Sequence, residues 1–204
     1  MRLQKLYTSI LVVALVAAAA LVVVLAFQKR ALMERQQELA ARSRDPHPGF
    51  YVPAIDIETV TGDSVRLGET ADRGVQLLFV FATTCDFCKA SLPAWKEIAA
   101  QVGQKSVARI YGISVNPAEE TEVFVSEHDI GFPVVSFADR KLRALYRSYI
   151  VPQTVVLDSE VRVEYARVGA VTENAVIDSI IAQTNATLSR ATTGLSSPIV
   201  DSLP

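Results

Sequence analysis

The sequence has few residues that could bind a metal ion. Its 204 residues include 2 cysteines, Cys85 and Cys88, and 2 histidines, His47 and His128. The Cys-x-x-Cys spacing is that of half a zinc site, but tetrahedral zinc needs more ligands and only these histidines remain. We therefore expect neither a metal nor an organic cofactor.

An excess of charge of either sign is also lacking. Lys and Arg number 20 against 22 Asp and Glu, for a formal net charge of -2, and no basic stripe with interleaved aromatic residues is present. Nucleic acid is therefore excluded as the expected partner. The length, a hydrophobic content of 50% and a mean hydropathy of +0.27 predict one globular domain with a hydrophobic appendage.

The hydrophobic appendage lies at the start of the chain. Residues Ile10 to Phe27 include no polar side chain, and this run is long enough to cross a bilayer as a helix. A cleaved signal peptide is the alternative, because Ala17 to Ala20 offers small residues to a peptidase. The apolar run continues past these alanines without a polar break. We therefore expect residues 1–30 to form an uncleaved, single-pass anchor in the lipid bilayer.

Basic residues on both sides of this run bear on its orientation. Arg2 and Lys5 precede it, and five basic residues follow it: Lys29, Arg30, Arg35, Arg42 and Arg44. Charge counting alone would place the rest of the chain in the cytoplasm. We nevertheless expect the domain on the extracytoplasmic, periplasmic side of the cell membrane, because disulfides persist there and need management.

Composition divides the remaining chain into three parts. Residues 31–49 are polar and helix-favouring and end in Asp45-Pro-His-Pro-Gly49, which breaks any helix, so we expect a stalk. Residues 50–188 form the predicted domain. Residues 189–204 are rich in Ser, Thr, Gly and Pro without periodicity, and we expect a flexible C-terminal tail.

Hydrophobic patterns in residues 50–188 predict an α/β domain. Two short strands around the turn Thr61–Asp63 form an added hairpin, and the main pattern then runs strand, helix, strand, helix. The predicted strands cover residues 54–60, 64–67, 75–82, 107–115, 132–137, 154–158 and 161–168. Beyond the helix that starts at the cysteines, the predicted helices cover residues 117–128, 139–146 and 172–188. The helix after the cysteines has one predicted buried face, which consists of Phe87, Ala90, Ala94, Trp95, Ile98 and Val102.

Cys85 and Cys88 lie where a buried strand meets this helix. A thiol in the first helical turn faces unpaired backbone N–H groups and the positive end of the helix dipole, which favour its thiolate. A second thiol one turn later can resolve a mixed disulfide formed by the first. A purely structural disulfide is the alternative, but it would add little stability because the closed loop is so short. The placement favours a redox-active dithiol.

Three segments carry a resemblance to a known family: Cys85-Asp-Phe-Cys88, Pro93, and Tyr149-Ile-Val-Pro152-Gln-Thr before a strand. From Pro53 to about Leu188 the chain resembles the thioredoxin superfamily, and within it the membrane-anchored TlpA, ResA and MauD-type thiol-disulfide oxidoreductases. The resemblance implies a thioredoxin-like fold, in which helices flank a central mixed sheet. It also implies exchange with thiols and disulfides of client proteins in extracytoplasmic protein or cytochrome maturation, with a membrane-embedded or extracytoplasmic electron donor.

The resemblance assigns roles to further residues. Pro93 kinks the helix and separates the reactive first turn from the packed remainder. Val151 and Pro152 form a cis peptide bond that faces the dithiol, although a trans proline at a strand start is the alternative. With a cis bond, the backbone around Val151 offers an edge to an extended client segment. Reductase-type relatives often carry a glutamate where this chain has Ser91, so no carboxylate is expected to relay the proton of Cys88.

The expected mechanism uses Cys85 as the exposed attacking thiolate and Cys88 as the resolving thiol. Thr83 and Thr84 are candidates to cap the helix, and the Thr84 hydroxyl is also a candidate to bind a thiolate. Asp86 complements the positive end of the helix. Its charge also opposes a thiolate on Cys85, which would make the couple more reducing.

Two other functions are open. A peroxiredoxin-like peroxidase shares the fold, but the Pro-x-x-x-Thr-x-x-Cys pattern of that family is absent before Cys85. A non-enzymatic, Sco-like copper-handling module would use both thiols and His128, the one histidine of the predicted domain, usually with a wider cysteine spacing.

Overall fold

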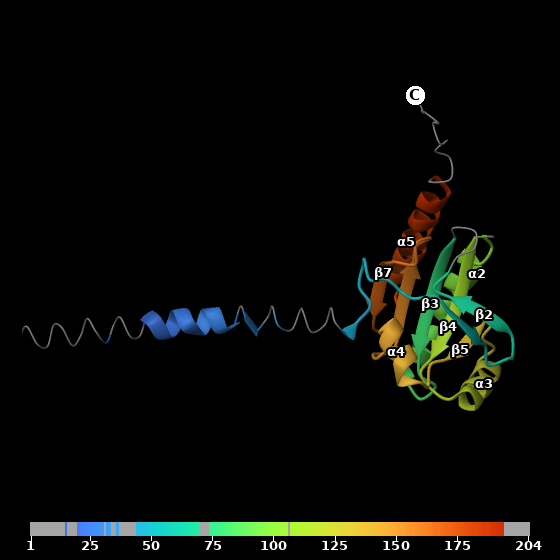
Figure 1. The fold of residues 1–204 in the computed structure, drawn as a ribbon, viewed down its shortest axis with the longest axis horizontal. Coiled ribbons are helices and arrows are strands. Elements are labelled where there is room, and N and C mark those ends of the chain that lie inside the picture. Colours follow the sequence, from blue (N-terminus) through green and yellow to red (C-terminus); the bar gives the residue numbers. More distant parts are fainter. Residues whose placement is uncertain are drawn as a thin grey trace, which may run out of the picture. The chain divides into compact units, whose positions relative to one another are not determined.

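The computed structural model of the chain, shown in Figure 1, contains two compact units, residues 1–43 and 44–204. It describes residues 15, 20–30, 32, 33, 36, 44–69, 74–105 and 107–193. In the first unit, residues 20–30 are helical. Most of the predicted anchor and the end of the predicted tail lie outside the described residues. Within the described ranges, none of the helices combines the length and the apolar character that crossing a membrane requires.

The second unit is built on a mixed sheet of five strands in the order β5-β4-β3-β6-β7. These strands are β3 (Val75–Phe81), β4 (Ala108–Ser114), β5 (Val134–Ser136), β6 (Gln153–Leu157) and β7 (Val163–Val168). β4 runs parallel to β3 and β5, whereas β6 runs antiparallel to β3 and β7. Every residue of the central strand β3 is buried, as expected of a continuous apolar run covered on both faces. The sheet confirms the predicted thioredoxin-like architecture.

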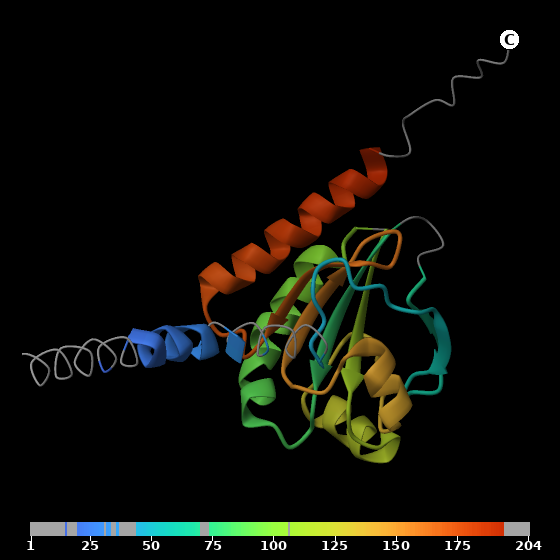
Figure 2. The ribbon, with the colours of Figure 1, turned by 60° about the vertical axis from the view of Figure 1, so that its left-hand side comes forward.

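Helices cover both faces of this sheet. They are α2 (Asp86–Val102), α3 (Ala118–Glu127), α4 (Arg140–Tyr146) and α5 (Asn174–Thr193). Residues of α2, α3 and α5 share one apolar cluster with Phe79 and Phe81 of β3, whereas Tyr146 of α4 packs with Leu78 and Val80 on the other face. Figure 2 shows α5 running beside α2. α5 begins at Asn174 and continues beyond the predicted end of that helix.

The burial of α2 corrects part of its predicted apolar face. Phe87 is 69% exposed, and Ala90 is also exposed. The buried residues are Cys88, Ser91, Leu92, Ala94, Trp95, Ile98 and Val102. Most of the buried residues recur at three- and four-residue spacing from Cys88, and Phe87 lies outside this stripe. The stripe places Ala90 on the opposite side of the helix.

The predicted added hairpin is present, and a buried glutamine attaches it to the sheet. Its strands are β1 (Ile55–Glu58) and β2 (Ser64–Leu67). Gln76 of β3 is fully buried; its Oε1 accepts from the Gly68 backbone N–H at 3.0 Å and its Nε2 donates to the Glu69 carbonyl at 2.6 Å. A buried amide satisfied by backbone groups fixes the position of the chain directly after β2.

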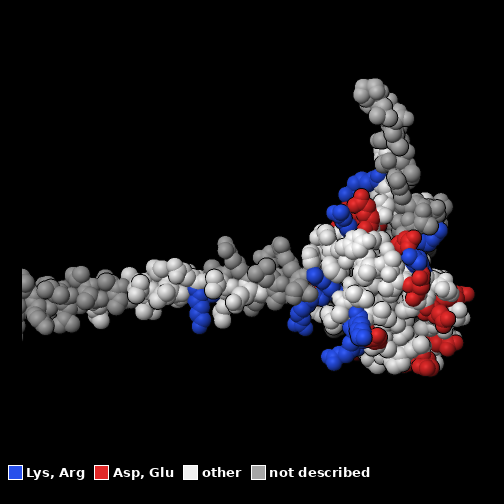
Figure 3. All heavy atoms as spheres, in the orientation of Figure 1, with Lys and Arg blue, Asp and Glu red and all other residues white. Residues whose placement is uncertain are grey.

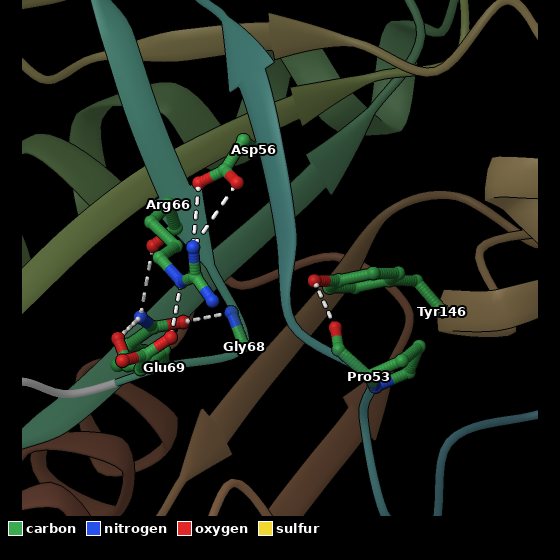
Figure 4. A network of polar contacts seen from close by, with 7 residues as sticks. Pro53, Asp56, Arg66, Gly68, Glu69 and Tyr146 are labelled. Carbon is green, nitrogen blue, oxygen red and sulfur yellow. Dashed lines mark hydrogen bonds and ion pairs between the residues drawn. The ribbon is translucent and has the colours of Figure 1, made fainter.

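Side chains on the hairpin and next to it make further polar contacts, which Figure 4 shows. The Tyr146 hydroxyl of α4 donates to the Pro53 carbonyl at 2.9 Å, and burial raises the pKa of this tyrosine, so the hydroxyl remains a donor. Arg66 lies between Asp56 and Glu69 and pairs with both. These ion pairs are exposed, so they contribute little to stability.

Candidate active site

The two thiols lie where β3 leads into α2. Cys85 is the N-cap residue of α2, and its Sγ accepts a hydrogen bond from the Cys88 backbone N–H at 3.2 Å. Both cysteines are free thiols; Cys85 is partly exposed and Cys88 is buried. The accessible sulfur therefore lies at the positive end of the helix dipole, in contact with the Cys88 N–H.

The capping group is this thiol, which corrects the expectation that Thr83 or Thr84 caps the helix. The backbone of Cys85 is extended, with φ -88° and ψ 113°, and directs its own side chain at the N–H of the third helical residue. Thr84 is exposed, whereas Thr83 is buried. The Thr83 hydroxyl instead donates to the Glu120 carboxylate of α3.

Cys88 differs from Cys85 in its environment. Its side chain is 0% exposed, and burial, together with a hydrogen bond to Cys85, raises its pKa from 9.0 to about 12. At neutral pH Cys88 is therefore protonated. The pair consists of one accessible sulfur and one buried thiol.

The turn before Cys85 is tied to α3 by three side chains, which we call the Thr83 cluster: Thr83, Asn116 and Glu120. The Thr83 backbone N–H donates to Asn116 Oδ1 at 3.1 Å, and Asn116 Nδ2 donates to Glu120 Oε1 at 3.0 Å. The Thr83 hydroxyl donates to the same carboxylate oxygen, which closes the cluster. Sequence analysis did not find this cluster, because it joins the turn after β3 to residues that follow β4.

The peptide bond between Val151 and Pro152 is cis, as the family resemblance implied. Val80 pairs with Gln153 in the antiparallel register of β3 and β6, so this bond lies at the end of the sheet where the chain leaves β3 for the dithiol. Val151 is partly exposed and Pro152 is buried. The Pro152 carbonyl accepts from the Gly169 backbone N–H at 2.9 Å.

Ser91, at the position where the family resemblance would have suggested a glutamate, makes structural hydrogen bonds. The fully buried Ser91 Oγ donates to the Phe87 carbonyl at 2.8 Å and accepts from the Val171 backbone N–H at 3.0 Å. It thereby joins the first turns of α2 to the loop after β7, close in the chain to Gly169. Sequence analysis noted the residue but not this contact.

The remaining predicted site residues lie on α2. Asp86 is exposed in the first turn, and Pro93 is exposed in the helix interior. Trp95 lies in the core, as predicted, and its indole N–H also donates to Thr154 Oγ1 of β6 at 3.0 Å. Within the described part of the chain, no three His, Cys, Asp or Glu residues are grouped so that they could hold a metal ion.

A free dithiol at the start of a helix, on a thioredoxin-like sheet, defines the class of thiol-disulfide oxidoreductases. The sequence profile of the AhpC/TSA family matches residues 45–166, and the chain belongs to this thioredoxin-like family.

Known relatives agree with this assignment. The chain is 31% identical over 132 residues to the thiol-disulfide oxidoreductase ResA of Oceanobacillus iheyensis, a match that covers 64% of this chain and 67% of that protein. It is 26% identical to ResA of Bacillus subtilis, with coverage of 64% and 72%. The thioredoxin domain of a thiol-disulfide oxidoreductase from Bacteroides vulgatus superposes with a TM-score of 0.57 at 18% identity, over 70% of this chain and 98% of that domain. This last likeness shows the fold, and the ResA relatives identify the protein as a thiol-disulfide oxidoreductase.

Proposed function

We propose that the protein is a membrane-tethered, extracytoplasmic oxidoreductase that exchanges its Cys85/Cys88 dithiol with disulfides of protein clients in protein or cytochrome maturation. The observation that carries the proposal is the difference between the two thiols. Cys85 is accessible and caps a helix, whereas Cys88 is buried with a raised pKa. This asymmetry suits one attacking and one resolving sulfur.

The exchange proceeds in two steps. The Cys85 thiolate attacks one sulfur of the client disulfide; a Cys85–client bond forms, and the other client cysteine leaves as a thiolate. Cys88 then attacks Cys85 Sγ, the Cys85–client bond breaks, and the client leaves with both cysteines reduced. The protein has lost two electrons and two protons to the client and now carries the Cys85–Cys88 disulfide.

The proton of Cys88 is the demanding part of the second step. With a pKa of about 12, Cys88 must lose its proton as it attacks, because little thiolate is present beforehand. The client thiolates that are released need protons, so they are suitable final acceptors. No carboxylate replaces the missing glutamate at Ser91, whose hydroxyl is occupied by the Phe87 and Val171 backbones, and we propose that water carries the proton.

The client segment is proposed to lie against the backbone around Val151 and Pro152. Extended segments bind by pairing with exposed backbone, and the sheet register puts this loop at the same end as the dithiol. The exposed Thr84 is proposed to contact the client or the thiolate, and Pro93 to separate the reactive first turn of α2 from the packed remainder of the helix.

The proposed tether rests on the sequence. Residues Ile10 to Phe27 include no polar side chain over a length that suits a bilayer. The extracytoplasmic side is proposed because a tethered dithiol serves clients where disulfides persist. An electron donor on or outside the membrane would return the disulfide to the dithiol.

Mixed-disulfide trapping tests the proposed function. Cys88→Ala is expected to accumulate covalent complexes with a disulfide-bonded client, because Cys85 attacks and nothing resolves the product. Cys85→Ser is expected to accumulate none. Non-reducing gels followed by mass spectrometry of the joined peptides measure both, and circular dichroism confirms that both variants fold. Equal trapping by the two variants would refute the assigned roles.

A further inference from the structure

A hollow of about 340 Å³ lies beside the dithiol, between the start of α2 and helix α3. Thr83, Thr84 and Lys89 line it on the α2 side, and the α3 side consists of Glu120, Val123, Phe124, Glu127 and His128. We call this site the α3 hollow. Thr84, which lines the hollow, precedes Cys85 directly in the chain, so the hollow begins one residue from the cysteine that we propose as the attacking group.

Part of the α3 hollow is apolar. Val123 is 57% exposed, although valine is normally a buried residue. Phe124, which also lines the hollow, is buried and stacks on Phe81 of β3 at 5.5 Å between ring centroids, so this part of the wall is packed against the sheet. The hollow therefore offers fixed apolar surface to the stem of a long side chain.

The charge around the hollow is negative. Residues 117–129, which contain α3, include no Lys or Arg and five carboxylates, which are Glu119, Glu120, Glu122, Glu127 and Asp129. Figure 3 shows acidic side chains gathered over α3, and basic ones over α4. The exposed Asp86 adds a negative charge at the first turn of α2. Lys89 and His128 are the basic residues among those that line the hollow.

One of these carboxylates is held in place. Glu120 accepts from Thr83 and Asn116 in the Thr83 cluster, so it does not need to be ordered when a ligand binds. Glu127 lies seven residues, or about two helical turns, further along α3 and also lines the hollow. Two carboxylates beside an apolar wall complement a long cationic side chain, and they repel an anionic one.

We propose that the α3 hollow binds a lysine or arginine side chain of the protein client, close in sequence to the client cysteine that Cys85 attacks. The aliphatic stem of that side chain lies against Val123, and its charged end lies between Glu120 and Glu127. The inference rests on the proposed function and adds the class of client: segments that are positively charged next to their reactive cysteine.

The test uses the reduced full-length chain and three disulfide-bonded peptides that differ at one position beside the cysteine, which is Lys, Ala or Glu. The rate at which each peptide oxidises the dithiol is measured at low and high salt. The Lys peptide is expected to react ~10-fold faster than the Glu peptide at low salt, with a smaller ratio at high salt, because the attraction is electrostatic.

Variants of Glu127 locate the effect. Glu127→Gln is expected to slow the Lys peptide ~3-fold and to leave the Ala peptide unchanged, whereas Glu127→Lys is expected to favour the Glu peptide. Glu160→Gln is the matched control, because Glu160 is an exposed carboxylate in the turn between β6 and β7, at the other end of the sheet. This control is expected to leave all three rates unchanged.

The outcomes separate the inference from the proposed function. If all three peptides oxidise the dithiol at one rate, or if Glu127→Lys does not reverse the preference, the inference is overturned and the proposed function stands. If none of the peptides oxidises the dithiol, the proposed function fails first.

Discussion

The Sγ atom of Cys85 accepts a hydrogen bond from the backbone N–H of Cys88 at 3.2 Å, so the thiol that we propose as the attacking group also caps α2. This contact links reactivity to helix stability. A thiol is a weak acceptor, whereas serine is among the preferred N-cap residues. The first turn of α2 is therefore capped by a weaker acceptor than serine would provide.

Replacing the capping thiol of Cys85 by alanine or by serine is expected to change the free energy of unfolding in opposite directions. Cys85→Ala removes the side-chain acceptor of the Cys88 N–H and leaves the Cys85 carbonyl, which accepts from the same N–H at 3.0 Å, whereas Cys85→Ser supplies a hydroxyl in place of the thiol. We expect Cys85→Ser to be more stable than Cys85→Ala by about 1 kcal/mol in urea unfolding, although neither variant exchanges disulfides. Thr84→Ala and Thr84→Ser serve as controls, because Thr84 is exposed and does not cap, and should differ by less than about 0.5 kcal/mol. Equal stability of the two Cys85 variants would show that the thiol does not cap the helix.

Asp86 is expected to make the couple more reducing. It is exposed in the first turn of α2, directly after Cys85, and its charge opposes a thiolate there. Asp86→Asn is expected to favour the reduced form and to raise the reduction potential by no more than about 20 mV, because the charge is solvent-screened. Equilibration with glutathione or dithiothreitol buffers measures the potential. No shift of the potential, or a shift to more reducing values, would show that the Asp86 charge does not make the couple more reducing. Glu97→Gln, on the exposed side of α2, provides a charge-matched control.

The buried Cys88 is expected to make stability depend on pH. Its pKa is about 12 in the folded protein and 9.0 for an ordinary thiol, because burial disfavours the thiolate. Below pH 9 both the folded and the unfolded protein keep the proton of Cys88, and the full stabilisation from burying the neutral thiol is present. As pH rises from 9 toward 12 the unfolded chain releases the proton and the folded one does not, so stability falls.

A pair of variants isolates this effect from other groups that titrate in alkali, such as Tyr111 and Tyr146. Both variants carry Cys85→Ser, which prevents disulfide formation, and one also carries Cys88→Ala. The urea midpoints of both variants are measured from pH 8 to pH 11. As the pH rises, the midpoint of the variant that retains Cys88 is expected to fall relative to that of the variant with Cys88→Ala. A difference that stays constant over this range would contradict the raised pKa of Cys88.

Local sequence patterns predicted the sheet and the position of the dithiol. The strand at residues 64–67 matches β2, and the continuous apolar run at residues 75–82 matches β3 within one residue. Such patterns succeed because strand and helix periodicity reflects burial in the finished fold. The cis bond at Pro152 came from the family resemblance and not from the pattern.

The contacts that position the dithiol could not be predicted in this way. Thr83 meets Asn116 and Glu120 from 33 and 37 residues away, and Ser91 meets Val171 from 80 residues away. The parallel pairing of β3 with β4 is what brings the turns that follow these two strands to the same end of the sheet. The cap was missed for a different reason: two threonines are better acceptors than a thiol, and the backbone conformation decided against them.

The Thr83 cluster is expected to position the turn that carries Cys85. Asn116→Ala removes the acceptor of the Thr83 N–H, held at 3.1 Å, and one donor to Glu120. A backbone N–H left without its partner costs about 1–3 kcal/mol where water does not replace it. We expect a loss of stability of that size in urea unfolding, and slower alkylation of Cys85 by iodoacetamide at every pH from 6 to 9. Gln183→Ala, at an exposed position on α5, should change stability by less than about 0.5 kcal/mol and leave the alkylation profile unaltered. If Asn116→Ala lowers stability but the alkylation profile of Cys85 does not move, the cluster stabilises the domain without positioning the thiol, because a displaced turn would alter the N–H groups around that sulfur.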